Sequence, residues 1–498
     1  MKKLLAAVVV LFLVFLVTRF YNLTLMPIFT DEVIYVRWAQ IANYDASWRF
    51  ISLTDGKQPF FIWLMMVVMR IFKDPLFAGR AASIFAGLGT MGGLFFLGLT
   101  IFRSKGVGLL AMFLYLVYPF ALVYDRMALM DGLVGMFCVW ALLFEILLVK
   151  TLRLDIALIL GMIIGGSILT KSSGLFNLYL LPFSLILFPW FEKNVARKLL
   201  LWLGLAVIVV VESQAIYSIL RLSPFFHIIT EKNAIFVYPF GEWLQHPLRF
   251  LEGNFKGLWN WFTVYFSWPM IGVLVWAAIT GRRYWREMLL TLVWFGLPFF
   301  LLALFGKVLY PRFIFFMTLP LLPWAAFAFF KIYCVSNKLV YALVKKSPLF
   351  AAGFLVLAGL WLYTDWRLLT NPYLAPIPES DQDQYLNAWP AGGGVKETVA
   401  FLEQESKKGK IFVATEGTFG LLPAGLEIYL YQNKNIEIKG FWPLNDPLSE
   451  EIIQKAKLQP TYLITNRLQA TPEKWPVSLV SRFRKGVGKD FLSLYKVN

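Results

Sequence analysis

Residues that could do chemistry gather in the connections between long apolar segments of this sequence. Two adjacent acids, Asp31 and Glu32, follow the first apolar segment, and Lys57 stands near the end of the same connection. Carboxylates can act as general bases, and lysine and arginine side chains can bind anions. Ionised groups beside a membrane are costly unless they have a function or lie in water. The function of these charged residues therefore depends on which side of a membrane they occupy.

Further acids and bases recur at the ends of later apolar segments. These are Asp125, Arg126, Asp131, Lys171, Lys307 and Arg312. If they share one membrane face with Asp31, distant parts of the chain meet at a single charged surface. The alternative for Asp31 is an N-cap of the helix that begins at VIYVRWAQIA, and for the bases an ordinary solvated rim. Both alternatives stay open for each residue taken singly.

The composition identifies an integral membrane protein. Of 498 residues, 59% are hydrophobic and 15% are charged, whereas soluble domains have about 25% charged residues. The net charge of +17 does not indicate nucleic-acid binding, because Lys and Arg gather in short connections between apolar segments. These basic connections are residues 102–106, 148–155, 191–198, 281–287 and 331–346.

Placing all five basic connections in the cytoplasm, as the positive-inside rule requires, nearly fixes the topology. About 11 transmembrane helices result, at lengths near the roughly 20 residues that a bilayer needs. They are residues 4–20, 77–101, 107–123, 132–149, 156–170, 174–190, 199–217, 263–280, 288–305, 313–330 and 349–364. The short apolar segment 59–72 is predicted to lie at the interface or to re-enter the membrane. We expect a multi-pass plasma-membrane protein with a cytoplasmic N-terminus, large outer loops at 21–76 and 218–262, and an outer C-terminal tail.

The C-terminal tail has the pattern of a soluble domain. An amphipathic helix followed by a buried strand recurs three times after residue 394, and FLSLYKV makes a final strand. This alternation predicts a small α/β domain. The predicted organisation is a membrane module at 1–364, a linker at 365–390 and an extracytoplasmic α/β domain at 391–498.

Four motifs in the outer connections resemble a known family. The acidic pair Asp31–Glu32 is followed by K-x-P-x-x-x-W at Lys57–Trp63, R-x-A-x-x-D at Arg126–Asp131 and L-T-K at Leu169–Lys171. Their order and spacing resemble the C-type (GT-C) membrane glycosyltransferases, in the group of the protein O-mannosyltransferases and the aminoarabinose transferase of lipid A. YPRFIFFMTLPLLP at 310–323 is similar to a late segment of that group.

The resemblance implies the reaction. Such enzymes transfer a sugar, with inversion, from a polyprenyl-phosphate donor in the membrane to an acceptor hydroxyl of a protein, glycan or lipid outside. The alcohol needs a base, and we expect Asp31 to serve, with Glu32 or Asp131 as a positioning group.

The resemblance also implies how the leaving phosphate is neutralised. Lys57, Lys171 and Arg312 are the expected phosphate-binding residues. Asp125, Arg126 and Asp131 are expected to position the acceptor or the sugar. No cofactor or metal ligand set is predicted, although a weakly bound divalent cation stays open.

Two other function classes compete with a transferase. A transporter or flippase of lipid-linked sugars would also gather charges near lipid phosphate, but it usually carries them near the bilayer midplane and often has internal repeats. Here the charges lie mainly at the ends of the apolar segments. A sensor with an outer ligand-binding domain would explain the tail but not the acidic pair. An enzyme is therefore the preferred interpretation.

Overall fold

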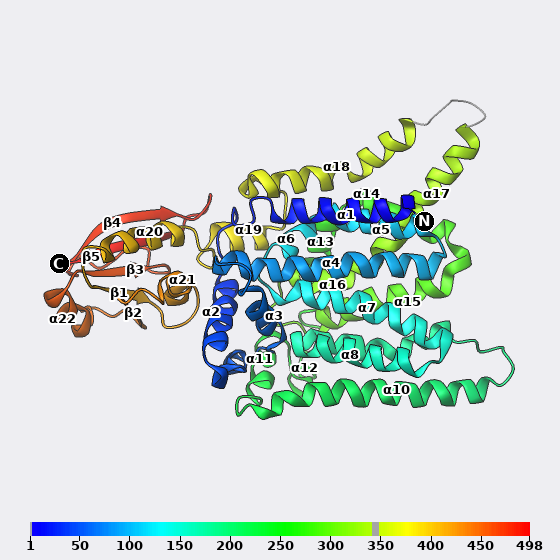
Figure 1. Cartoon of the computed structure of the whole chain (residues 1–498), viewed down its shortest axis with the longest axis horizontal. Helices are drawn as coiled ribbons and strands as arrows, with labels where there is room; N and C mark the ends of the chain where they lie inside the picture. The colour runs from blue at the N-terminus through cyan, green and yellow to red at the C-terminus, as the bar shows by residue number, and fades with distance from the viewer. Residues whose placement is uncertain (1, 341–347) are drawn as a thin grey trace.

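The computed structural model describes residues 2–340 and 348–498; the end of the last basic connection, 341–346, lies outside the described residues. Long helices run side by side, and the C-terminal domain sits at one end of their bundle (Figure 1). The long helices are α1 (Lys2–Phe20), α4 (Pro75–Phe102), α7 (Met130–Thr151), α8 (Leu154–Thr170), α10 (Val195–Tyr217), α15 (Trp285–Phe305), α17 (Leu322–Val340) and α18 (Pro348–Thr370). The N-terminus lies at the end of the bundle far from the C-terminal domain.

Two predicted spans are broken where the sequence places a proline. The segment 107–123 divides into α5 (Lys105–Leu116) and α6 (Pro119–Asp125), bent by 64°, and 263–280 divides between α13 (Leu251–Phe266) and α14 (Trp268–Thr280), bent by 90°. Pro119 and Pro269 stand in the first turn of the second helix of each pair. Proline lacks an amide hydrogen, so it ends one helix and is accepted at the start of the next.

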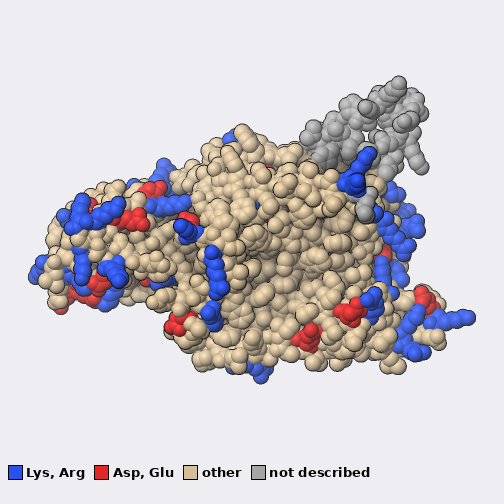
Figure 2. Space-filling view, viewed as in Figure 1, with Lys and Arg blue, Asp and Glu red and all other residues tan. Residues whose placement is uncertain are grey.

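The surface of the bundle is that of a membrane protein. Six helices among the described residues are long and apolar enough to cross a bilayer, or eight if each bent pair is one span. The viewed face of the bundle is largely free of charged side chains in its middle, and basic side chains gather at the end far from the C-terminal domain (Figure 2). A mainly helical polytopic architecture is thus confirmed, while the number of about 11 spans stays a prediction.

Short helices form a layer between the bundle and the C-terminal domain. The longest, α2 (Thr30–Tyr44), runs across the ends of the long helices (Figure 1). It is accompanied by α3 (Phe60–Val68), α11 (Ile228–Phe236) and α12 (Phe240–Trp243). With nine residues, α3 is shorter than a bilayer-spanning helix. Of the charged residues that the motifs singled out, Asp31 and Glu32 lie on α2, and Lys57 lies just before α3.

The C-terminal domain contains a five-stranded mixed sheet in the order β2-β1-β3-β5-β4. Its strands are β1 (Ile411–Glu416), β2 (Ile436–Phe441), β3 (Thr461–Thr465), β4 (Val477–Arg484) and β5 (Phe491–Val497). The first three are parallel, and each follows a helix: α20 (Val395–Ser406), α21 (Leu421–Leu430) and α22 (Glu450–Leu458). The α/β prediction is confirmed. β4 was not predicted, because its largely exposed side chains give no buried-strand pattern.

The domain is hydrogen-bonded to α2. Thr30 donates from both its amide and its hydroxyl to the carbonyl of Pro390, and the amide of Gly392 donates to the carbonyl of Ile28. Further along α2, the Arg37 guanidinium pairs with Glu427 of α21 at 2.9 Å. The start of α2, where Asp31 lies, is therefore fixed between the helical bundle and the C-terminal domain.

Candidate functional site

The two acids of the opening motif have different structural roles. The N-cap of α2 is Phe29, and Asp31 is the second residue of the helix, so the alternative that Asp31 is an N-cap is wrong. Glu32 takes the capping part instead, because its carboxylate accepts a hydrogen bond from the amide of Phe29 at 3.0 Å. The Asp31 carboxylate takes no part in the cap and can make contacts outside the helix.

Asp31 is held by two cations from different parts of the chain. Its Oδ2 accepts a hydrogen bond from Nη2 of Arg312 at 2.9 Å, and its Oδ1 lies 3.5 Å from Nζ of Lys57. Burial raises the pKa of Asp31, but Lys57 and Arg312 outweigh it and lower the pKa to about 2. The same carboxylate raises the pKa of Lys57 against the effect of its burial. Asp31 is therefore ionised at neutral pH.

A second ion pair joins Lys171 and Asp131. Nζ of Lys171 is 2.6 Å from Oδ1 of Asp131, and it also lies 4.7 Å from the centre of the Phe313 ring. Among the described residues, Nη1 of the buried Arg312 side chain has no hydrogen-bond partner. A buried guanidinium with an unused donor is well suited to an anionic ligand.

These residues line one cavity of about 700 Å³ at the end of the bundle. Four basic side chains, Lys57, Lys171, Lys232 and Arg312, outnumber the carboxylates Asp31 and Asp131. The rest of the wall is largely apolar, and includes Leu175, Phe176, Tyr179, Phe236, Phe240, Leu301, Leu302, Phe305 and Phe316. The cavity thus has a cationic end and an apolar wall. This combination fits a lipid that carries a phosphate.

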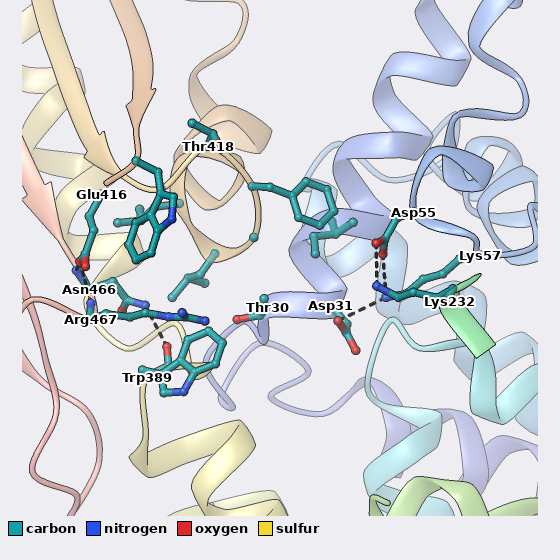
Figure 3. A pocket seen from close by; sticks show the side chains of 17 residues that line it. Thr30, Asp31, Asp55, Lys57, Lys232, Trp389, Glu416, Thr418, Asn466 and Arg467 are labelled. Carbon is teal, nitrogen blue, oxygen red and sulfur yellow. Dashed lines mark hydrogen bonds and ion pairs between the residues drawn. The ribbon is translucent and has the colours of Figure 1, made fainter. Parts of the chain in front are cut away.

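A second cavity, of about 350 Å³, opens between α2 and the C-terminal domain. Figure 3 shows Asp31, Lys57, Asp55 and Lys232 on one side of it, and Glu416, Asn466 and Arg467 on the other. Asp55 pairs with Lys232 at 2.6 Å and with Lys57 at 3.6 Å. Five residues line both cavities: Thr30, Asp31, Lys57, Lys232 and Trp389. Asp31 is therefore the carboxylate at the junction of the two spaces.

Three of the residues expected to act in the reaction do not line either cavity, and neither does Lys307. Glu32 is fully buried and forms a fork with Arg80, with contacts of 2.9 and 2.8 Å, while it also accepts from the amide of Ala128. Asp125 is buried against Arg19 and Tyr115. The Arg126 guanidinium donates to the main-chain carbonyls of Thr18, near the end of α1, and of Tyr21 and Asn22 just after it. These residues connect α2, α4, α6 and the end of α1 to one another.

Several cavity residues were not singled out from the sequence. Asp55 adjoins Lys57 in the string DGKQPFF, so its position was a usable signal. Lys232 stands in the connection after α10, where no motif marks it. Trp389, Glu416, Asn466 and Arg467 come from the C-terminal domain and its linker, and only the tertiary structure places them opposite Asp31.

The residues present do not fit a divalent cation. Asp31 is engaged by Arg312 and Lys57, and Asp131 by Lys171. Hard cations such as Mg²⁺ need several free oxygen ligands, whereas here each carboxylate that lines the larger cavity is already neutralised by a basic side chain. Lysine and arginine are therefore the groups that neutralise the carboxylates of this cavity.

Comparisons with known proteins agree with this architecture. Residues 56–217 match the family model described as dolichyl-phosphate-mannose-protein mannosyltransferase. The structure is similar to ArnT from Cupriavidus metallidurans bound to undecaprenyl phosphate, with a TM-score of 0.60, 16% identity and 98% of both chains covered. The chain has the C-type glycosyltransferase fold. The resemblance inferred from the four motifs is thus confirmed.

The C-type fold is shared with a second kind of enzyme. The archaeal oligosaccharyltransferase AglB from Archaeoglobus fulgidus, in complex with an inhibitory peptide and a dolichol-phosphate, has a TM-score of 0.52 at 14% identity, covering 93% of this chain and 69% of that chain. No curated protein matches the sequence of the chain. Because the match to ArnT extends over nearly the whole of both chains, the C-type fold here includes the C-terminal domain.

Proposed function

We propose that the protein transfers a sugar from a polyprenyl-phosphate donor to an acceptor hydroxyl at the outer face of the membrane, with inversion and with Asp31 as general base. The observation that carries the proposal is the position of Asp31. Its carboxylate lies at the junction of an apolar, cationic cavity in the bundle and a polar cavity at the soluble domain. Donor and acceptor can thus approach the same carboxylate from different sides.

The donor phosphate is proposed to bind at the cationic end of the larger cavity. Arg312 offers its unpartnered Nη1, and Lys57 and Lys171 lie on the same cavity wall. The prenyl chain would follow the apolar wall formed by residues such as Phe176, Phe236 and Phe305. The solved relative ArnT was crystallised with undecaprenyl phosphate, which supports this ligand class.

In the proposed step, the acceptor oxygen forms a bond to the anomeric carbon while the bond from that carbon to the phosphate oxygen breaks. The hydroxyl proton passes to the Asp31 carboxylate, and the bonding electron pair leaves on the phosphate. Attack from the side opposite to the phosphate inverts the anomeric configuration. The cations stabilise the charge that develops on the leaving group, an effect worth about 2.7–4 kcal/mol per donor.

Asp131 is proposed as the group that positions the sugar, since it is the remaining carboxylate of the larger cavity. Glu32, Asp125 and Arg126 are proposed to hold the scaffold instead, because they are engaged in buried contacts outside the cavity. A flippase of lipid-linked sugars is less well supported. It would not need a carboxylate at the junction with a second, polar cavity.

The reaction is tested by analysis of membranes from cells with and without the protein. Loss of the protein should make a sugar-linked polyprenyl phosphate accumulate and should remove one surface modification, both measured by mass spectrometry. Wild type should restore both and Asp31→Asn neither. Restoration of both by Asp31→Asn would exclude Asp31 as the base.

The outer location is tested separately by cysteine labelling in a background without Cys138 and Cys334. Cysteines placed at Asn43 and Gln404, both exposed, should react with a membrane-impermeant thiol reagent in intact cells. A cysteine at Ser104 should react only after the membrane is opened. The reverse pattern would place the site in the cytoplasm.

A further inference from the structure

The second cavity is formed by the carboxyl ends of all three parallel strands of the C-terminal domain. Gly417 to Gly420 follow β1, Trp442 follows β2, and Asn466 and Arg467 follow β3. In the order β2-β1-β3, the connection from β1 leads to β2 on one side, and the next connection runs back past β1 to β3 on the other side. In open α/β sheets, ligands bind outside the carboxyl ends of the strands at such a switch point.

The carboxyl edge of β1, β2 and β3 does not favour a phosphate ligand. Main-chain amides at the end of a strand commonly hold anions, but here the carboxylate of Glu416 accepts from the amides of Asn466, Arg467 and Leu468 at 2.7, 2.7 and 3.0 Å. The charges around the cavity also balance. Three carboxylates, Asp31, Asp55 and Glu416, face three bases, Lys57, Lys232 and Arg467. An uncharged, hydrogen-bonding ligand suits these walls better than an anion.

The aromatic side chains of the cavity are unusually exposed. Trp442 is 59% exposed, Phe419 57% and Trp389 39%. The Arg467 guanidinium lies 3.7 Å from the centre of the Trp389 ring, which holds both groups at the cavity wall. Large exposed rings beside polar groups mark a binding surface. The apolar C–H face of a pyranose ring stacks on such rings while its hydroxyls meet the polar groups.

We propose that the carboxyl edge of β1, β2 and β3 binds the carbohydrate part of the acceptor and directs one of its hydroxyls to Asp31. The inference rests on the proposed function for Asp31, and it adds the chemical class of the acceptor and the residues that select it. Trp442 and Phe419 provide stacking surfaces, and Arg467 and Asn466 provide hydrogen bonds.

Buried contacts hold this site in place. The Lys485 ammonium, which is fully buried, donates to the carbonyls of Trp389 and Ala391 at 2.9 and 2.6 Å and also to the side chain of Asn466. It therefore links the strand β3 edge to the segment that hydrogen-bonds Thr30, the neighbour of Asp31. Preorganised walls reduce the entropy cost of binding a ligand.

The test measures saccharide binding by the full chain in lipid nanodiscs, because maltoside detergents are themselves sugars. Saturation-transfer NMR is recorded with mannotetraose, chitotetraose and maltotetraose, and with a Ser/Thr-rich peptide. We expect at least one saccharide to bind, and we expect Trp442→Ala and Arg467→Ala each to weaken its binding about tenfold, which corresponds to about 1.4 kcal/mol. Trp48→Ala and Arg482→Ala are matched controls, since these residues do not line the cavity, and they should bind as wild type.

Binding of a short-chain polyprenyl phosphate is measured on the same samples. It should be unchanged in Trp442→Ala and Arg467→Ala but weakened in Arg312→Ala. If no saccharide binds, if the Trp442 and Arg467 variants bind it as wild type does, or if only the peptide binds, the carbohydrate proposal is overturned. The proposed transferase function would then still stand, provided that the lipid phosphate binds and depends on Arg312.

Discussion

Oδ2 of Asp31 accepts a hydrogen bond of 2.9 Å from Nη2 of Arg312, although the two residues are 281 positions apart in the chain. This pair joins the proposed base to the proposed phosphate-binding group. An anion that binds at Nη1 of Arg312 partly neutralises the guanidinium that also holds Asp31. Binding of the donor is thus expected to release Asp31 partly from the cation that makes it a weak base.

Asp31→Asn should abolish most of the transfer and leave donor binding intact. The amide keeps the shape of the side chain but cannot take a proton, and loss of a general base typically lowers the rate by about 10²–10⁴-fold. Turnover and lipid-phosphate binding are measured on the purified protein. Asp55→Asn is the matched control, since Asp55 also contacts Lys57 but not Arg312, and it should lose far less activity. Equal losses in both variants would contradict a base at position 31.

Arg312→Lys should impair the transfer although it keeps the positive charge. Lysine cannot contact Asp31 and a phosphate with two separate nitrogens of one planar group, as arginine can. Loss of one such donor is expected to lower the rate by about 10²–10³-fold. Steady-state kinetics with the lipid-linked donor check this, and full activity of Arg312→Lys would show that the guanidinium fork is not used.

Glu32→Gln should chiefly destabilise the protein. Arg80 and Glu32 are both completely buried, and removing one partner of a buried ion pair costs about 3–5 kcal/mol because the other charge is left uncompensated. Thermal unfolding in nanodiscs should therefore shift to a clearly lower temperature, while the activity per folded molecule changes far less than in Asp31→Asn. A stable but inactive Glu32→Gln protein would instead show that Glu32 takes part in the reaction.

The pH dependence of the rate should report the pair Asp31–Arg312. In the free protein, Lys57 and Arg312 outweigh burial and lower the pKa of Asp31 to about 2, so kcat/KM should stay level as the pH falls well below neutral. A bound phosphate neutralises these cations and raises the pKa, so the acid limb of kcat should lie at higher pH than that of kcat/KM. An acid limb of kcat/KM near neutral pH would assign the base to another group.

The sequence alone was sufficient to predict the fold class and one group of cavity residues. Hydropathy and the pattern of the tail predicted a polytopic helical protein with a C-terminal α/β domain. The motifs drew attention to Asp31, Lys57, Asp131, Lys171 and Arg312, which the structure brings to one cavity. Short motifs succeed here because each lies where a long apolar segment ends, so the bundle gathers them at the same level.

The remaining features depend on contacts that no local pattern records. Glu32 adjoins Asp31 in the sequence, yet it turns inward because Arg80, 48 residues later, is buried beneath it. Asp125 likewise turns toward Arg19 of α1. The strand ends that carry Trp442 and Arg467 face Asp31 only because the domain packs on α2. Tertiary packing therefore decides which side chains of the motifs face the cavity and which are buried in the scaffold.

The division of the site between two folding units has a consequence for how such proteins diversify. The bundle carries Asp31, Lys57 and Arg312, whereas the loops after β1, β2 and β3 form the opposite wall of the second cavity. Phe419, Trp442 and Arg467 in these loops are exposed, so exchanging them leaves the packing of the sheet and of the bundle unchanged. Under the proposed function, a lineage can therefore acquire new acceptors for the same donor sugar by altering residues 419, 442 and 467.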